Sequence, residues 1–422
     1  MSRPRALIRA VAARPVRRVR AAARSAQDRL LPAPAAQWVH RTHLRWAYGQ
    51  DRVEVRPSGS VLFVTSNGAG MGHITRMLAV ASALPQGTPA TILTLSKGYR
   101  RVADLGIPIR YFPSHDAAQM SPRTWNDLFG REVIKTVEEL QPSGVVFDGA
   151  WVYRGLHEVC RAAGIPLIWM QRGCWREESD RKAVQRHRAA TVSDEIIVPG
   201  DYGCPEVVDV GPGIEVHHVN PITLTTADEL LDRDAACAAL GLDPADRHVL
   251  INLGGGTIYD GQEAAVTSLE AVLGLGQDWV PVMTKSPLSE SETEDSRLRV
   301  VSAYPIARCF RAFDFAVAAA GYNTVQESIA LGLPTIFVPN ERTVTDDQVR
   351  RARTAQELGL GRCARSGEEL AQQIASVARL LDDPGHTWPE APVPADGAEA
   401  AAQIVSGRLK HSPSAEGDDD IP

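Results

Sequence analysis

Three glycine-containing turns in the sequence place chemistry-bearing side chains next to backbone that can approach a ligand. In the first turn, Ser66–Arg76, three alternate glycines stand directly before His73. Glycine lets the backbone turn sharply after a strand and pass close to a ligand. The helix predicted to follow would put His73 beside a positive helix end, which disfavours an imidazolium ion. We therefore expect a neutral imidazole that can accept a proton.

The first turn does not fit a dinucleotide site. Its pattern is G-x-G-x-G-H, so His73 stands where the G-x-G-x-x-G motif needs its third glycine. Leu95, at the end of the next predicted strand, is followed by Ser96 and Lys97 rather than by an acidic residue that would bind a ribose. A lone histidine is most often structural, but the place of His73 directly after such a turn favours a functional role.

The second turn, Gly321–Thr324, follows an apolar run and begins a helical pattern. We expect the helix to start at Asn323 or Thr324, where exposed N–H groups suit a phosphate. Glu327 lies one turn inside, so its carboxylate either binds paired hydroxyls, such as those of a ribose, or forms a capping box with Thr324. Asp346–Gln348, after the next predicted strand, offers polar groups over the same cleft or is an exposed acidic helix start.

The third turn, Gly254–Thr257, combines small residues and a hydroxyl at a strand-to-helix junction, which fits an oxyanion or diphosphate contact.

Strands and helices that alternate along the chain must position these turns. The first set of predicted strands comprises 60–65, 91–95, 144–148, 166–170 and 195–198, with helices over 132–140 and 152–163. After a connection at 217–228 the pattern restarts with strands over 249–253, 279–283, 298–301, 315–318 and 335–338, and helices over 324–331 and 347–358. This alternation predicts two doubly wound α/β halves, each with a parallel sheet covered on both faces.

We predict four segments from this pattern and from the charge. They are a basic extension over 1–56, domains over 57–222 and 223–383, and a segment over 384–422 with a proline-rich linker, a short helix at Ala398–Leu409 and an acidic tail. Residues 1–56 carry 13 Arg and three acids, a net charge of +10, while the remainder sums to −16. An acidic body argues against nucleic acid as the main partner.

The basic extension has two interpretations that the sequence leaves open. It is either an arm that lies on an anionic membrane surface or a solvated basic tail. The chain has no run of 18 apolar residues, and its six cysteines show neither CxxC nor zinc spacing. We expect reduced thiols in a cytoplasmic protein, peripheral on the inner face of the plasma membrane if the arm binds lipid.

The segments Gly68–Arg76 and Gly321–Pro334 resemble the inverting nucleotide-sugar glycosyltransferases with two Rossmann-like domains (GT-B). The nearest group is the family of the GlcNAc transferase that makes the peptidoglycan lipid intermediate, with its plant and bacterial glycolipid relatives. The resemblance spans roughly residues 60–380, and its most specific part is the pattern G-Y-N-T-x-x-E-x-x-x-x-G-x-P. It implies two domains that face a central cleft, the first for the acceptor and the second for the donor.

The resemblance also implies a UDP-sugar as co-substrate. Glu327 matches the acid that holds the ribose hydroxyls, and Gln348 matches a glutamine that touches the donor sugar, whereas Asp347 replaces a second glutamine and leaves the sugar open. The residues implied to bind the donor are Gly254, Gly255, Gly256, Thr257, Tyr304, Ile306, Gly321, Tyr322, Asn323, Thr324, Glu327, Asp347 and Gln348.

Transfer to a hydroxyl needs a base that removes its proton. His73 is the first candidate, Asp148 the second as base or orienting partner, and Asp116 beside His115 the third, although a loop-capping role suits Asp116 better. In the family that the chain resembles, helix N-termini and side-chain donors stabilise the leaving diphosphate without a required metal ion. The acidic run at 418–420 is typical of a solvated tail.

We therefore predict the transfer of GlcNAc or another hexose from a UDP-sugar to an acceptor hydroxyl that is lipid-linked or part of the cell envelope. The alternatives are a nucleotide-sugar epimerase or hydrolase of the same fold, a transferase that uses a soluble natural-product acceptor, and a binding module without turnover.

Overall fold

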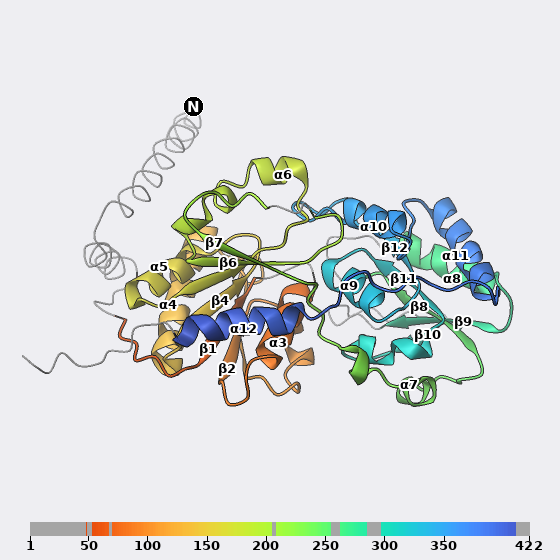
Figure 1. The fold of residues 1–422 in the computed structure, drawn as a ribbon, viewed down its shortest axis with the longest axis horizontal. Helices are drawn as coiled ribbons and strands as arrows, with labels where there is room; N and C mark the ends of the chain where they lie inside the picture. The colour runs from red at the N-terminus through yellow and green to blue at the C-terminus, as the bar shows by residue number, and fades with distance from the viewer. Residues whose placement is uncertain are drawn as a thin grey trace, which may run out of the picture.

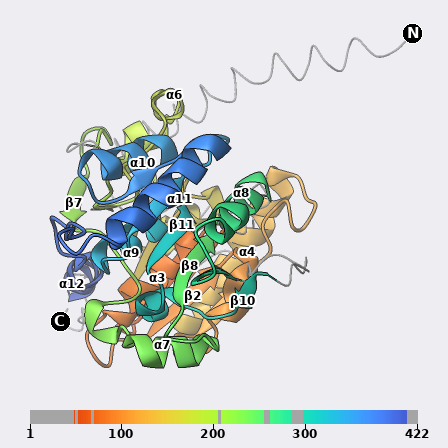
Figure 2. The ribbon, with the colours of Figure 1, turned by 90° about the vertical axis from the view of Figure 1, so that its right-hand side faces the viewer.

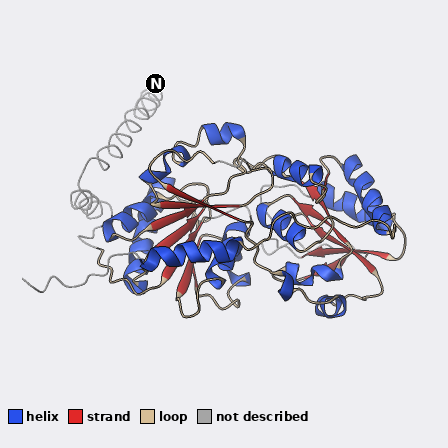
Figure 3. Ribbon diagram, in the orientation of Figure 1, coloured by secondary structure: helices blue, strands red, loops and turns tan. Residues whose placement is uncertain are grey.

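A computed structural model describes residues 48, 53–66, 70–204, 208–254, 262–284 and 297–410. These residues form two α/β domains that lie side by side (Figure 1). Each domain is built on one parallel sheet, with helices packed against both faces (Figure 3). The predicted fold class, two doubly wound Rossmann-like domains, is confirmed.

The first sheet has the strand order β3-β2-β1-β4-β5-β6-β7. Its strands are β1 (Val61–Thr65), β2 (Ala90–Thr94), β3 (Ile109–Tyr111), β4 (Gly144–Asp148), β5 (Leu167–Met170), β6 (Glu195–Pro199) and β7 (Glu215–Val219). The helices between them are α3 (Gly72–Ser82), η1 (Lys97–Arg101), α4 (Pro122–Leu140), α5 (Arg154–Ala163), α6 (Glu177–Arg181) and η2 (Arg186–Thr191).

Apolar side chains on both faces of this sheet explain its helical cover. Along β4, Val145 and Phe147 point to one core, whereas Val146 points to the other, as the alternation of a strand requires. The first core holds α4 and α5; α4 contributes Trp125, Phe129 and further apolar residues at helical spacing. The second core holds α3, whose buried face includes Ile74, Met77 and Leu78.

The second sheet repeats the arrangement in the order β10-β9-β8-β11-β12-β13. Its strands are β8 (Arg247–Asn252), β9 (Trp279–Thr284), β10 (Arg299–Val301), β11 (Phe315–Ala319), β12 (Thr335–Val338) and β13 (Arg362–Cys363). Its helices are η3 (Ala227–Glu229), α7 (Arg233–Leu240), α8 (Gln262–Leu273), η4 (Ile306–Ala312), α9 (Tyr322–Ala330), α10 (Gln348–Glu357) and α11 (Gly367–Leu381). Helices α8 and α11 cover one face and α7 covers the other (Figure 2).

The last described helix, α12 (Gly397–Lys410), returns to the first domain, where it contacts α3, β4 and β7 (Figure 1). Its buried small residues, Ala398, Ala401, Ala402 and Val405, join the core on the α3 side of the first sheet. The short helix predicted at Ala398–Leu409 is present, and it is part of the core of the first domain.

The sequence pattern missed three short strands. We expected a connection at 217–228, but β7 (Glu215–Val219) adds a parallel edge strand beside β6. Of its five residues only Val219 is buried, so the strand lacks the apolar pattern by which strands are recognised. Strands β3 and β13 have three and two residues and carry too short a pattern to detect. The other predicted strands and helices that lie among the described residues correspond to elements of the structure.

A buried network of charges joins the two domains. The guanidinium group of Arg351 on α10 donates to Asp201 of the first domain at 2.6 and 2.7 Å and to Asp346 at 2.7 Å. The side chains of Arg351 and Asp201 have no exposed surface. Arg172, which follows β5, reaches Asp346 from the other side at 3.2 Å. Two positive and two negative side chains therefore balance across the domain boundary.

Replacing Arg351 with methionine should destabilise the protein strongly, because it leaves the Asp201 carboxylate buried without its partner. Removing one member of a buried ion pair costs about 3–5 kcal/mol. We expect a clearly lower melting temperature in a calorimetric scan. The matched control is Arg365→Met, whose surface pair with Glu341 is about 40–50% exposed and should contribute at most about 1 kcal/mol. Equal melting temperatures for the two variants would contradict this account.

Candidate functional site

His73 and Asp148 lie together at the carboxyl edge of the first sheet. Strands β1 and β4 pair in parallel with Thr65 opposite Asp148, and the N–H of Ser66, just after β1, donates to the carbonyl of Asp148 at 2.9 Å. Helix α3 starts at Gly72 and holds His73 in its first turn. His73 Nδ1 lies 2.9 Å from Asp148 Oδ1. The structure thus brings together two residues that the sequence singled out separately.

Arg76, one turn further along α3, completes this group. Its Nη2 donates to Asp148 Oδ1 at 2.8 Å and also lies 2.7 Å from Oδ2. The Arg76 and Asp148 side chains are each 1% exposed, and that of His73 is 13% exposed. A carboxylate so deeply buried needs a positive partner, and Arg76 supplies it.

These contacts decide which groups are ionised. Burial alone would raise the pKa of Asp148, but the charges and hydrogen bonds of Arg76 and His73 outweigh it and hold that pKa at about 2. Burial lowers the pKa of His73; Asp148 opposes this effect, and the positive charges of Arg172 and Arg76 reinforce it. The group therefore combines an ionised carboxylate with a neutral imidazole at neutral pH. With Nδ1 turned to Asp148, Nε2 is the nitrogen that can accept a proton.

The second turn meets this group from the other domain. Helix α9 starts at Tyr322 with Gly321 as its N-cap residue and has no side-chain cap. The expected start at Asn323 or Thr324 is therefore one or two residues late, and Thr324 does not form a capping box with Glu327. The Arg76 guanidinium carbon lies 4.7 Å from the centre of the Tyr322 ring. Asn323 Nδ2 donates to the carbonyl of Gly72 at 3.2 Å.

Glu327 is half-buried on α9 and accepts a hydrogen bond from the backbone of Leu224, in the connection between the domains. Burial raises the pKa of Glu327 to about 7, although that hydrogen bond opposes the rise. The carboxyl group therefore titrates near neutral pH.

Tyr304 lies at the domain boundary, where its hydroxyl is 2.6 Å from Thr75 Oγ1 on α3. Burial raises the pKa of this hydroxyl, and the charge of Glu327 contributes to the rise, which places Glu327 near Tyr304. Ile306 is the first residue of η4.

The remaining predicted donor residues fall into two groups. Gly254 has a φ of +80°, a left-handed conformation that favours glycine, whereas Gly255, Gly256 and Thr257 lie outside the described residues. Asp347 caps α10 by accepting from the backbone of Arg350, and the side chain of Gln348 accepts from the backbone of Asn340 at 2.9 Å.

An apolar cavity of about 410 Å³ lies in the first domain beside α4. Its lining residues are Phe112, Pro113, Ala118, Met120, Trp125, Leu128, Arg131, Glu132 and Lys135. Met120 is 41% exposed. Three charged residues, Arg131, Glu132 and Lys135, border a space whose other lining residues are apolar. The third candidate base, Asp116, is 82% exposed and contacts His115 in the loop between β3 and α4.

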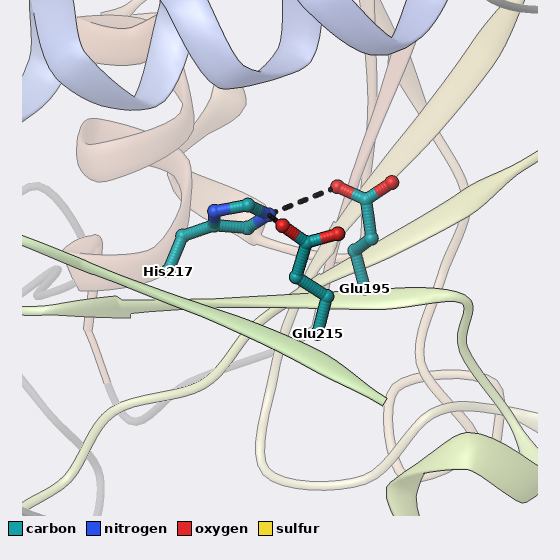
Figure 4. A group of neighbouring side chains, drawn as sticks. All are labelled: Glu195, Glu215 and His217. Carbon is teal, nitrogen blue, oxygen red and sulfur yellow. Dashed lines mark hydrogen bonds and ion pairs between the residues drawn. The ribbon is translucent and has the colours of Figure 1, made fainter. Parts of the chain in front are cut away.

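Glu195, Glu215 and His217 form a separate cluster whose ligand atoms lie within 4.8 Å of one another (Figure 4). In the described part of the chain, it is the group with spacing suited to a metal ion. It lies at the starts of β6 and β7, the edge of the sheet opposite His73. Glu195 pairs with His217 at 3.1 Å and with Arg408 of α12 at 3.1 Å. We interpret the cluster as an ion-pair network that attaches α12 to the sheet.

Sequence reasoning missed two positively charged residues near His73. Arg76 has a detectable signal, because a residue three positions after His73 falls on the same helix face. Arg172 follows β5 and lies close enough to influence His73 because β5 is next to β4 in the sheet, an order that the sequence alone does not show. The sequence shows a basic residue there but not its partner Asp346, which belongs to the other domain.

Comparison with known proteins agrees with this architecture. Residues 276–405 match the family model described as the glycosyltransferase family 28 C-terminal domain. A relative from Paenarthrobacter aurescens is 26% identical over 300 residues, which are 65% of this chain and 76% of that protein. It is named UDP-N-acetylglucosamine–N-acetylmuramyl-(pentapeptide) pyrophosphoryl-undecaprenol N-acetylglucosamine transferase.

Solved structures share the fold. The glycotransferase of kitacinnamycin superposes with a TM-score of 0.55 at 17% identity and covers 84% of this chain and 100% of its own. MurG of Acinetobacter baumannii superposes with a TM-score of 0.50 at 16% identity, with coverage of 84% and 100%. From the match of residues 276–405, the sequence relatives and the shared fold, we conclude that the chain is a glycosyltransferase with the GT-B fold whose second domain is similar to family 28 C-terminal domains.

Proposed function

We propose that the protein is an inverting glycosyltransferase that moves GlcNAc or another hexose from a UDP-sugar to a hydroxyl of a lipid-linked acceptor. The observation that carries this proposal is the buried pair of His73 and Asp148, which faces the start of α9 across the domain boundary. A neutral imidazole held by an ionised carboxylate is suited to take a proton from a hydroxyl.

The placement of the pair supports inversion at the sugar. The base belongs to the first domain, and the turns proposed to hold the diphosphate belong to the second. Attack and departure would then occur on opposite sides of the anomeric carbon. As the acceptor oxygen bonds to that carbon, its proton moves to His73 Nε2 and the carbon–oxygen bond to the diphosphate breaks. The N–H groups at the start of α9 would stabilise the leaving charge.

Glu327 is the proposed ligand of the ribose hydroxyls. Its half-buried position on α9, between one and two turns after the N-cap residue Gly321, is consistent with a nucleotide whose diphosphate lies at the helix start. Asp347 and Gln348 are proposed to lie near the donor sugar, although in this structure their side chains stabilise their own loop.

The apolar cavity beside α4 supports an acceptor with a hydrocarbon part. Most of its lining is apolar, and of the three charged lining residues Arg131 and Lys135, but not Glu132, would attract an anionic group attached to that part. The relative from P. aurescens is named for an undecaprenol-linked substrate. Among the described helices none is long and apolar enough to cross a membrane. We propose a peripheral position on the cytoplasmic face, with residues 1–56, which are largely outside the described part, as an additional anionic-lipid contact.

Replacing His73 with alanine should abolish transfer and leave donor binding nearly intact, because the base contributes about 10²–10⁴-fold to the rate. Turnover is measured with a panel of UDP-sugars, and UDP binding by calorimetry. The control is His218→Ala, an exposed residue of the edge strand β7, which should retain wild-type turnover. Full turnover by His73→Ala would remove His73 from the mechanism. Consumption of the donor without any acceptor would instead favour a hydrolase or epimerase.

Donor affinity should rise with pH through the titration of Glu327. The pKa of Glu327 is raised to about 7, so the carboxylate that accepts ribose hydroxyls is mostly protonated at pH 6 and mostly ionised at pH 8. UDP-GlcNAc suits the calorimetric test because its diphosphate diester stays ionised over this range. Glu327→Gln should bind more weakly at pH 8 and show a flat profile. A profile in the variant as steep as in the wild type would assign the pH dependence to another group.

Met120→Glu should reduce turnover of a polyprenyl-diphosphate-linked acceptor by introducing a charge into the apolar cavity. Turnover of a short, water-soluble acceptor should change little, so the ratio of the two rates is the measurement. Val184→Glu is the matched control, because Val184 is another exposed apolar residue of the first domain, 64% exposed, and does not line the cavity. Equal losses of turnover with both acceptors would show that the cavity does not select the lipid-linked acceptor.

A further inference from the structure

The first turns of α3 and α9 meet across the domain boundary. Two side-chain contacts join them: Asn323 Nδ2 donates to the Gly72 carbonyl at 3.2 Å, and Arg76 stacks on the ring of Tyr322. A third contact joins α3 to the segment before η4 of the same domain, where the Tyr304 hydroxyl lies 2.6 Å from Thr75 Oγ1. The first contact involves the residue just before His73. The helix start that carries the proposed base is therefore held by residues of the donor domain.

Arg76 is the member of this contact set that also touches the catalytic pair. Its Nη2 contacts both oxygens of Asp148, at 2.8 and 2.7 Å, and lies 3.4 Å from His73 Nδ1. Its guanidinium carbon lies 4.7 Å from the centre of the Tyr322 ring, a distance typical of a cation–π contact. Tyr322 is fixed in turn, because its hydroxyl accepts the N–H of Ile222 at 3.0 Å.

We propose that Arg76 is a positioning residue that couples the donor domain to the catalytic pair. Through one guanidinium group, the ring of Tyr322 on α9 orients the carboxylate of Asp148, and that carboxylate orients His73. The inference rests on the proposed role of His73 as the base. It assigns to Arg76 a role through Asp148 and does not require Arg76 to touch substrate.

The charges around His73 indicate what the coupling controls. Asp148 at the end of β4 favours the imidazolium form, while Arg76 on the same helix and Arg172 after β5 oppose it. From the second domain, Tyr322 faces Arg76, and Asp201 of the first domain adds a more distant negative charge. A histidine beside an uncompensated carboxylate would become protonated more readily. Arg76 cancels the charge of Asp148 and leaves the hydrogen bond to orient the ring, so His73 remains a free base.

The test is the titration of His73 by NMR in protein labelled at its histidines, which needs no substrate. The His73 resonance is assigned by its absence in His73→Gln. Arg76→Met should move the titration midpoint of His73 to higher pH, because a nearby positive charge is lost. Arg76→Lys keeps the charge and should produce a smaller shift. Tyr322→Leu should also raise the midpoint, although Tyr322 lies in the other domain. Tyr322→Phe keeps the ring but loses the hydrogen bond to Ile222, so its midpoint should lie nearer the wild-type value than that of Tyr322→Leu.

Arg247→Met is the matched control. Arg247, at the start of β8 in the second domain, stacks on Trp279 at 3.8 Å and pairs with Asp382 at 2.5 Å, so its loss should lower the melting temperature and leave the His73 midpoint unchanged. An unchanged midpoint in folded Arg76→Met, or in Tyr322→Leu, would overturn the coupling. If Arg76→Met does not fold, Arg76→Lys and Tyr322→Leu decide the question in the same way.

The two proposals fail separately. If His73→Ala retains full turnover, the base assignment is wrong whatever the NMR titration shows. If His73→Ala is inactive but the titration midpoint of His73 is unchanged in Arg76→Met and Tyr322→Leu, the proposed function stands and the coupling is wrong.

Discussion

The buried charge of Asp148 is the constraint on which the proposed active site depends. A carboxylate with 1% of its side chain exposed at the end of β4 requires compensation. Arg76 provides it from the first turns of α3, and His73 uses the remaining hydrogen-bonding capacity of the same group. Moving either residue one position along the helix would rotate it away by about 100°. The spacing of His73 and Arg76 is thus fixed by one carboxylate.

A second buried acid, Asp201, imposes a similar constraint at the same boundary. Its partner Arg351 comes from the opposite domain, so this pair forms only when the domains are packed together. Arg172 connects the two groups, since it pairs with Asp346 and contributes positive charge near His73. The domain boundary is consequently an electrostatic unit, in which charges from both domains determine the ionisation of groups in the cleft. Packing and chemistry at this boundary are not separable.

The sequence was sufficient for features that depend on local pattern. Buried strands such as Gly144–Asp148 are continuous apolar runs between turns, and the glycine-containing turns identify the ends of strands that face the cleft. It was insufficient where the partner is distant. The contact of Arg76 with Asp148 spans 72 positions and depends on the pairing of β1 with β4. The contact between the Tyr304 hydroxyl and Thr75 joins the two domains, and the relative placement of two domains leaves no trace in the pattern of either one.

Because α12 packs on the first sheet, the first domain cannot finish folding until this late segment of the chain has been synthesised. During translation, the strands of the first domain emerge long before Gly397–Lys410, and until then Val219 and Ile222 lack the small side chains that cover them. That domain therefore completes its core only after Gly397–Lys410 has left the ribosome. The first domain is interrupted in sequence, because α12 follows the second domain along the chain but packs on the first. A chimaera that exchanges the first domain between relatives would therefore have to exchange α12 as well.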